Sequence, residues 1–301
     1  MPELIPPSLD HLRAFLAVVE EGSFNAAAKR LGRAISVVSY AISQLEAQLD
    51  VRLFDREGSR RPTLTPDGEA LLGEARAVSD DIDALLAKVR SLRQGLEPEL
   101  SLAVDVMVPG HILAALLRDF QFMYPTVPLR LHVEALGAVA ALVLEGRATL
   151  AIAGPDLLDL PDLERETVGA VELVPVAAPG HPLARAGKIA SGEARKHVQL
   201  VLTDRSPLTE GRDFSVLGTR SWRLADLGAK HALLREGIGW GSMPRHAVAD
   251  DLASGALVEL HLPERPALRY SLVALWRKDT PPGPAAVWVL DAFRERLGGG
   301  V

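Results

Sequence analysis

The first apolar positions of the chain repeat with the period of a helix and predict three short helices before residue 50. The first helix ends at Gly22, the second runs from an N-cap at Ser23 to Gly32, and the third continues to about residue 49. Alanines in the second helix allow a neighbouring helix to approach closely. The third helix carries one apolar stripe that we expect to face the core, formed by Val38, Ile42, Leu45 and Leu49.

The glycine-containing turn between the second and third helices predicts a helix-turn-helix. When this motif binds DNA, its second helix enters the major groove and side chains of that helix contact base edges. The same geometry also occurs in purely structural helix bundles, so the pattern alone leaves both interpretations open. The candidate DNA contacts are Ser36, Val37, Ser39, Tyr40 and Ser43 on the third helix, with Ser23 and Arg33 beside it.

Residues 53–65 predict two short extended segments around a polar tip, which form a hairpin, or wing, after the third helix. Arginines cluster near that tip and can pair with phosphate oxygens of DNA. Such contacts position a protein on the duplex without reading its sequence. The candidate phosphate contacts are Arg56, Arg60 and Arg61.

A long helix is predicted from Pro66 to about Arg93, with Thr65 as its N-cap. Its apolar residues keep a heptad spacing, which is typical of a helix that packs along another helix. The partner helix belongs either to the same domain or to a second copy of the chain. We favour self-association, because dimeric DNA-binding proteins match two half-sites. The candidate dimer contacts are Leu71, Val78, Ile82, Leu85 and Val89.

After a predicted hinge at residues 95–98, strands and helices alternate, which indicates an α/β domain. The segments that carry this pattern include residues 100–106, 127–136, 149–154, 172–178 and 269–276. Ligands of such domains bind beyond the carboxyl ends of strands and near helix N-termini. The candidate ligand contacts are Asp105, Met107, Val108, Leu136, Gly137, Thr203, Ser242 and Met243.

Asp105 leaves two interpretations open. Its carboxylate follows the first strand of the α/β domain, where it would repel an anionic ligand and attract an amine. It could equally cap the helix that is predicted to begin at Pro109.

The composition excludes several classes of site. The 301 residues contain no cysteine, which excludes disulfides, thiolate zinc sites and cysteine nucleophiles. We expect no secretory signal at the start, and no apolar run is long enough for a membrane span. The net charge of −6 argues against nucleic acid. However, residues 29–61 carry more basic than acidic side chains, which form either a phosphate-binding patch or an ordinary solvated face.

Residues 9–72 resemble the amino-terminal module of the LysR-type transcriptional regulators. The resemblance rests on FLAVVEEGSFNAAAKRLGRAISVVSYAISQLEAQLDVRLFDR and on the closing LTPDGEALL. The remaining chain is similar to the effector domain of this family at FMYPTVPLRLHV, PGHPLA, REGIGWGSMPRHAV and DLASGALVEL.

The start of the third helix departs from the family pattern. Ala34 and Ile35 replace a usual Ser/Thr-Gln pair, and Tyr40 replaces a usual Arg or Gln. The missing glutamine removes a side chain that can read adenine with two hydrogen bonds. Apolar contacts, for instance between Ile35, Val37 or Tyr40 and thymine methyl groups, are expected in its place.

The resemblance implies an α/β protein with an all-α amino-terminal part. We expect a winged helix-turn-helix domain at residues 1–65, a linker and dimerisation helix at 66–94, and an effector-binding domain at 95–301. That last domain is expected to have the type 2 periplasmic-binding-protein-like fold. Its two Rossmann-like subdomains would comprise about 98–167 with 270–301, and about 168–269.

The function implied by the resemblance is sequence-specific DNA binding that responds to a small-molecule effector in the cytoplasm. The expected partners are double-stranded DNA, the effector, further copies of the chain in a dimer or tetramer, and RNA polymerase. No cofactor, metal or membrane is expected. An enzyme is one alternative, but the sequence contains no hydrolase, metalloprotease or P-loop motif. A stand-alone solute-binding protein is another, but it predicts a signal peptide and no basic module.

Overall fold

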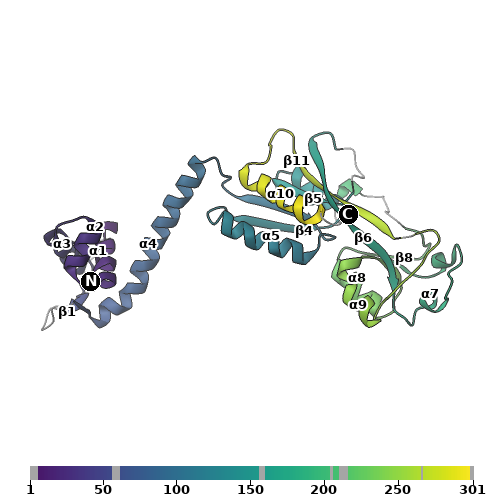
Figure 1. Ribbon diagram of the computed structural model, residues 1–301, viewed down its shortest axis with the longest axis horizontal. Helices are drawn as coiled ribbons and strands as arrows, with labels where there is room; N and C mark the ends of the chain where they lie inside the picture. The colour runs from purple at the N-terminus through teal and green to yellow at the C-terminus, as the bar shows by residue number, and fades with distance from the viewer. Residues whose placement is uncertain are drawn as a thin grey trace. The chain divides into compact units, whose positions relative to one another are not determined.

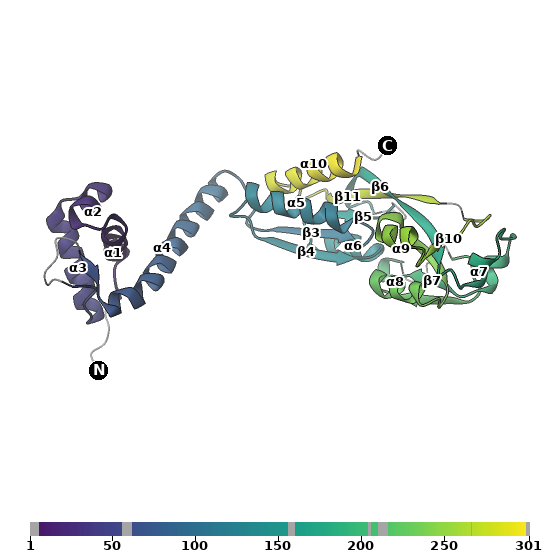
Figure 2. The same cartoon turned by 60° about the horizontal axis from the view of Figure 1, so that its bottom comes forward.

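The computed structural model describes residues 6–55, 62–155, 160–203, 206–209, 216–265 and 267–298. The chain forms two compact units, Met1–Ser91 and Leu92–Val301, whose elements are labelled in Figure 1 and Figure 2. Among the described residues, no helix has both the length and the apolar character needed to cross a membrane. The three-part domain division stays a prediction.

The first unit is built on α1 (Leu9–Glu21), α2 (Phe24–Leu31) and α3 (Ile35–Leu49). Gly22 and Gly32 end α1 and α2 at φ angles of 66° and 63°, a left-handed conformation that glycine adopts without steric cost. The Ser23 hydroxyl caps α2 by accepting a hydrogen bond from the Ala26 N–H at 3.1 Å. The core that these helices share includes Leu12, Phe15, Val18, Ala27, Val38, Ile42 and Leu45.

A two-stranded ribbon, β1 (Phe54–Asp55) and β2 (Thr63–Leu64), follows α3 in antiparallel register. The Phe54 ring meets the rings of Phe15 and Phe24 edge-on, at centroid distances of 5.6 and 5.7 Å. The buried Glu46 carboxylate accepts hydrogen bonds from the backbone N–H groups of Leu53 and Phe54. These contacts attach the base of the wing to all three helices.

α4 (Pro66–Arg93) begins where the sequence predicts. The Thr65 hydroxyl accepts a hydrogen bond from the Gly68 N–H at 3.0 Å. A Cβ atom on Gly68 would lie 2.3 Å from the Leu53 carbonyl oxygen, so glycine allows the first turn of α4 to press against the wing.

The second unit has a mixed sheet of nine strands in the described part of the chain, with the order β4-β3-β5-β11-β6-β9-β7-β8 and β10 paired with β6. The strands are β3 (Leu100–Asp105), β4 (Leu129–Glu134), β5 (Leu150–Ala153), β6 (Leu163–Ala177), β7 (Gln199–Leu202), β8 (Ser221–Leu224), β9 (Trp240–Pro244), β10 (Val258–Glu259) and β11 (Leu268–Arg277). The helices are α5 (Gly110–Met123), α6 (Gly137–Leu144), α7 (Pro182–Arg185), α8 (Leu227–Arg235), α9 (Ala249–Ser254) and α10 (Pro284–Gly298).

The strands divide into two parallel groups joined by two long antiparallel strands. β3 is parallel to β4 and β5, and β7 is parallel to β8 and β9. β6 and β11 run antiparallel to their neighbours and connect the two groups, as Figure 1 shows. This arrangement agrees with the expected pair of subdomains linked by crossover strands.

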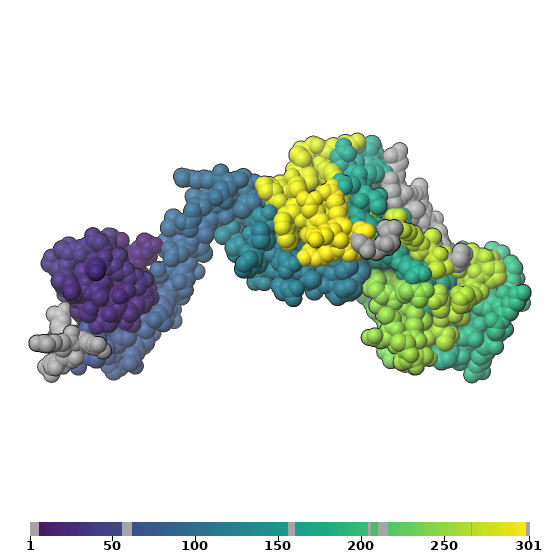
Figure 3. Space-filling view, viewed as in Figure 1, coloured from purple at the N-terminus to yellow at the C-terminus, as the bar shows by residue number. Residues whose placement is uncertain are grey.

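Helices cover both faces of the first strand group. Leu102 and Val104 of β3 pack in one core with α5 and α10, whereas Ala103 packs in another with α6. β3 is therefore buried along its whole length, as is typical of parallel strands between two helical layers. Figure 3 shows α10 (yellow) lying on the segment that contains α5, and an ion pair between Arg296 and Asp119 at 2.6 Å links these helices.

The sequence pattern predicts residues 172–178 of β6 but misses residues 163–171 and all of β8. The missed part of β6 is rich in charged residues and contains Gly169, and such residues are depleted in strands. A Cβ atom at Gly169 would lie 2.5 Å from the Leu297 Cβ atom, so glycine permits α10 to pack directly on the strand. Next to Gly169, Val168 is an extra residue that shifts the register against β11.

Candidate functional site

The first turns of α3 expose large apolar side chains next to hydroxyl groups. Ile35, Val37 and Tyr40 are exposed by 48, 44 and 63%, although side chains of this kind are usually buried. Residues three and four positions apart are neighbours on a helix surface, so the hydroxyl groups form a row beside them. The predicted contacts in that row are Ser36, Ser39 and Ser43.

The turn before α3 places Arg33 at the surface. Its guanidinium lies 2.9 Å from the Asp10 carboxylate, and that hydrogen bond and charge lower the pKa of Asp10. This ion pair is exposed and screened by solvent, so a phosphate could displace the carboxylate. Ala34 precedes α3 without a side-chain hydrogen bond to the helix. The predicted wing contacts Arg56, Arg60 and Arg61 lie outside the described residues.

The apolar seam of α4 divides into a packed part and an exposed part. Leu71 and Ala75 pack on the core of the helix-turn-helix. Further along, Val78, Leu85 and Val89 are exposed by 45, 57 and 39%, and Ile82 is half-buried. The chain's own first unit therefore covers the beginning of the seam and leaves the rest at the surface.

The second unit contains a cavity of about 190 Å³. Met107, Leu136 and Pro155 reach it just beyond the carboxyl ends of the parallel strands β3, β4 and β5, which is where ligands of α/β sheets bind. The opposite wall comes from β7, α8, β9 and the chain around β11. The other lining residues are Leu173, Gln199, Leu200, Val201, Leu202, Lys230, Ser242, Arg265, Leu268 and Tyr270.

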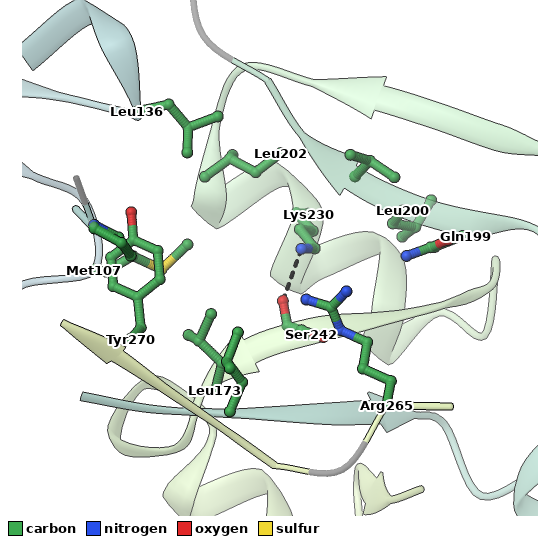
Figure 4. Close-up of a pocket in the computed structure, with 13 residues that line it drawn as sticks. Met107, Leu136, Leu173, Gln199, Leu200, Leu202, Lys230, Ser242, Arg265 and Tyr270 are labelled. Atoms are coloured by element: carbon green, nitrogen blue, oxygen red, sulfur yellow. Dashed lines mark hydrogen bonds between the residues drawn. The ribbon is translucent and has the colours of Figure 1, made fainter. Parts of the chain in front are cut away.

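Two cations reach this mostly apolar cavity, and Ser242 contacts both of them (Figure 4). The Lys230 ammonium donates a hydrogen bond to the Ser242 carbonyl oxygen at 2.7 Å, and Arg265 Nε donates to the Ser242 hydroxyl at 3.2 Å. Lys230 is only 4% exposed. Burial lowers the pKa of its ammonium to about 7, and the positive charge of Arg265 acts in the same direction.

Gly241 makes room for the lysine side chain. A Cβ atom at Gly241 would lie 3.1 Å from Lys230 Cε and 2.7 Å from the Leu200 carbonyl oxygen. The backbone of β9 can therefore pass directly beneath the lysine stem, which carries the ammonium from α8 to the cavity.

Asp105 lies behind the cavity wall and does not line it in the described part of the chain. Its buried carboxylate accepts hydrogen bonds from the Met107 N–H at 2.8 Å, the Leu136 N–H at 3.2 Å and the Tyr270 hydroxyl at 3.2 Å. It does not cap α5, which begins after Pro109 without a side-chain hydrogen bond. Asp105 thus holds three residues that do line the cavity.

Burial raises the pKa of Asp105 to about 6, against the hydrogen bonds that stabilise its charged form. Burial and the nearby carboxylate also raise the pKa of Tyr270. The Tyr270 hydroxyl fits here because a Cβ atom at Gly154 would lie only 1.9 Å from it.

Leu136 adopts a strained backbone conformation at the rim of the cavity. Its φ and ψ angles are 51° and −128°, a region that a branched side chain rarely occupies. Strain of this kind costs about 1–3 kcal/mol and persists where surrounding contacts enforce it. The hydrogen bond from its N–H to Asp105 is one such contact.

Three of the predicted ligand contacts, Met107, Leu136 and Ser242, line the cavity. The described lining does not include Val108, Gly137, Thr203 and Met243, nor Asp105. Four further lining residues are not predicted from the sequence. They come from α8, β7 and the segments at β11, and are Lys230, Gln199, Arg265 and Tyr270. The neighbouring sequence does not mark Lys230 as a cavity residue, because α8 also carries His231 and Arg235.

Two family models match the sequence of this chain. The one described as LysR substrate binding domain matches residues 93–298, and the one described as bacterial regulatory helix-turn-helix protein, lysR family, matches residues 9–69. The probable HTH-type transcriptional regulator YhaJ of Escherichia coli (strain K12) is 29% identical over 296 residues, which cover 97% of each chain. The uncharacterized HTH-type transcriptional regulator Rv2282c of Mycobacterium tuberculosis (strain ATCC 25618 / H37Rv) is 32% identical over 310 residues, covering 96% of this chain and 97% of its own.

Solved structures share the fold. An OxyR mutant of Corynebacterium glutamicum superposes with a TM-score of 0.56 at 20% identity, covering 98% of this chain and 95% of its own. CrgA, a LysR-type transcriptional regulator from Neisseria meningitidis, gives a TM-score of 0.50 at 24% identity, covering 96% and 98%. Because the two family models together match most of the sequence, this chain belongs to the LysR family and is a DNA-binding transcriptional regulator with an effector-binding domain.

Proposed function

We propose that the exposed side of α3 reads base edges in the major groove and that the cavity of the second unit binds the effector. The observation that supports the first part is the exposure of Ile35, Val37 and Tyr40 on a helix whose other side is fully packed. An apolar group at these positions can contact the methyl group of thymine, which marks A·T pairs in the major groove. Arg33 and the wing arginines would add contacts with phosphate groups.

A gel-shift series with DNA that flanks the chain's own gene tests this function. We expect a salt-sensitive complex that resists non-specific competitor DNA, because phosphate contacts release counterions and base contacts give specificity. Absence of such a complex at every effector concentration would overturn the proposal. Loss of the complex in Tyr40→Asp, with retention in Asn25→Asp on the exposed side of α2, would assign the contact to α3.

The exposed part of the α4 seam supports self-association. Val78, Leu85 and Val89 leave an apolar stripe uncovered by the first unit, and a second copy of α4 would bury it. In sedimentation, Ile82→Asp should convert the oligomer to monomers, because it places a charge in the seam. Ala84→Asp adds the same charge at an exposed position off the seam and should leave the oligomer intact. An unchanged oligomer in Ile82→Asp would count against α4.

We further propose that the protein acts by binding rather than by catalysis. It would work in the cytoplasm, as a dimer or a tetramer of two dimers, and contact RNA polymerase. An effector that binds one arrangement of the two subdomains more tightly than another shifts the population toward that arrangement. Its effect on DNA binding is then limited by that difference in affinity.

A further inference from the structure

The described lining of the cavity contains two cationic side chains and no carboxylate. Asp105, the last residue of β3, is turned away into hydrogen bonds with Met107, Leu136 and Tyr270. No acidic side chain of the described residues forms an ion pair with Lys230. The described lining therefore carries more positive than negative side chains, which disfavours a cationic ligand and favours an anion.

Lys230 has hydrogen-bonding capacity beyond its structural contact. An ammonium group has three N–H donors, and the one hydrogen bond that Lys230 makes to a described residue goes to the Ser242 carbonyl oxygen. Two donors are then available for a ligand. The group is 4% exposed, so water satisfies them poorly and a negatively charged acceptor would stabilise the ammonium strongly.

Arg265 approaches the same point from the segment before β11. Its Nε atom is held by the Ser242 hydroxyl, and Figure 4 shows its guanidinium and the Lys230 ammonium converging beside this serine. A planar guanidinium matches the two oxygens of a carboxylate, and a lysine adds a point charge. The pair of side chains thus fits one carboxylate group.

The rest of the cavity fits an apolar body. Met107, Leu136, Leu173, Leu200, Leu202 and Leu268 supply hydrocarbon side chains on the remaining walls. The volume of this partly open cavity is about 190 Å³, and an apolar cavity of about 150 Å³ accommodates benzene. A polyanion such as a sugar phosphate would leave most of its polar groups against hydrocarbon, without hydrogen-bonding partners.

We infer that the effector is a monocarboxylate whose apolar body is about the size of one ring, with its carboxylate bound between Lys230 and Arg265. This inference rests on the proposed effector role of the cavity. Its charge is opposite to that of the amine which Asp105 would attract under one of the two interpretations of the sequence. At one end of the cavity, Lys230 and Arg265 pair with the carboxylate of the ligand. At the other end, the apolar walls bury the body of the ligand.

Isothermal titration calorimetry of the full-length protein tests this with monocarboxylates of increasing body size, namely acetate, hexanoate, cyclohexanecarboxylate, benzoate and phenylpropionate. Each ring compound is paired with its amide and its amine, and inorganic phosphate serves as a simple anion. We expect the ring-sized acids to bind at least tenfold more tightly than their amides, amines and phosphate.

Two substitutions locate the acid group. Lys230→Met keeps the length of the side chain without its charge and should weaken carboxylate binding by about ten- to a hundredfold, the usual effect of losing a charge-assisted hydrogen bond. Lys188→Met removes the same charge at an exposed position of the second unit and should leave the affinity unchanged. Arg265→Gln should weaken binding in the same direction as Lys230→Met.

A measurement on the unaltered protein gives independent evidence. Carboxylate binding to Lys230 should draw a proton from the solution at pH 8, because the pKa of the free ammonium is about 7 and a paired anion raises it. Calorimetry in two buffers with different ionisation enthalpies measures this proton uptake. If Lys230 only links α8 to β9 through its hydrogen bond, ligand binding should cause no proton uptake.

The inference is overturned if the amides or amines bind as tightly as the acids, if Lys230→Met keeps full affinity, or if no acid of the series binds. These outcomes leave DNA binding untouched, since the gel-shift series reports on the first unit. Conversely, a chain that binds benzoate but no DNA would refute the proposed function while retaining the carboxylate site.

Discussion

The two units of this chain place their candidate contacts in opposite environments. On α3, the contacts belong to one helix, lie at the surface and carry no charge, whereas in the second unit two charged side chains from distant segments meet inside a cavity. DNA brings its own negative charge, so a reading helix can use apolar and hydroxyl groups while arginines nearby bind the phosphates. A small ligand must be oriented within the protein, so charge is more effective when it is buried with few competing donors.

The substitution with the largest expected effect is Phe54→Ala, which tests whether the two units function independently. This ring packs against Phe15 and Phe24 and joins the wing to the helices, so its removal should destabilise the first unit by about 3–5 kcal/mol. DNA binding should be lost in gel shifts, while calorimetry should detect unchanged carboxylate binding. Phe122→Ala, at a ring that is 85% exposed, serves as the control. Loss of both activities in Phe54→Ala would show that the two units depend on one another.

Lys230→Met should separate stability from ligand binding. Replacing the buried ammonium with a hydrocarbon side chain of similar volume removes the cost of burying a charge, so the variant should be at least as stable as the unaltered protein at pH 7. Because burial lowers the pKa of Lys230 to about 7, the unfolded chain binds more protons than the folded chain between about pH 7 and 10. Stability of the unaltered protein should therefore rise with pH in this window relative to the variant, as measured by urea denaturation. A variant that is less stable at pH 7 would indicate that the ammonium is needed for folding.

Asp105→Asn tests the support behind the cavity wall. The amide has one acceptor oxygen, so one of the N–H groups of Met107 and Leu136 loses its partner, at a cost of about 1–3 kcal/mol. The pKa of Asp105 is raised to about 6, so its contribution is full below the unfolded pKa of about 4 and declines as pH rises through 6. Urea denaturation should thus show a larger difference between the two proteins at pH 5 than at pH 7.5. The reverse pH trend would contradict a buried carboxyl group with a raised pKa.

The smallest expected effect concerns the apolar side of α3. Replacing a contacted thymine in the binding site by uracil removes one methyl group, and burial of such a group is worth about 0.8 kcal/mol. Affinity in gel shifts should fall about fourfold at each contacted thymine and remain unchanged at thymines outside the footprint. Equal affinity for the fully uracil-substituted site would exclude methyl contacts by Val37 or Tyr40.

The difference between the regions also explains how far the sequence could predict them. The ends of α1 and α2 follow from Gly22, Ser23 and Gly32, whose effects on the backbone are local. The exposed side of α3 follows from a period that separates buried from unburied positions within one helix. Such signals need no knowledge of the rest of the fold.

The cavity depends on contacts between segments that are far apart in the chain. Lys230 is buried because β9 passes beneath it at Gly241. The local sequence around either residue does not predict this contact. Asp105 is recognisable as a residue at a strand end, but its orientation is set by Tyr270, which lies on β11. A strand end therefore predicts the place of a ligand site better than it predicts which side chains meet the ligand.

The register shift between β6 and β11 has a mechanical consequence. These strands pass through both halves of the second unit, so the halves can move relative to one another only if the paired strands bend or twist. Val168 interrupts the ladder between the pairs Leu272–Gly169 and Val273–Thr167. A bulge already lacks regular pairing and bends more readily than the ladder on either side. Any relative movement of the two halves would therefore bend these paired strands, and Val168 is the point where their regular pairing is already interrupted.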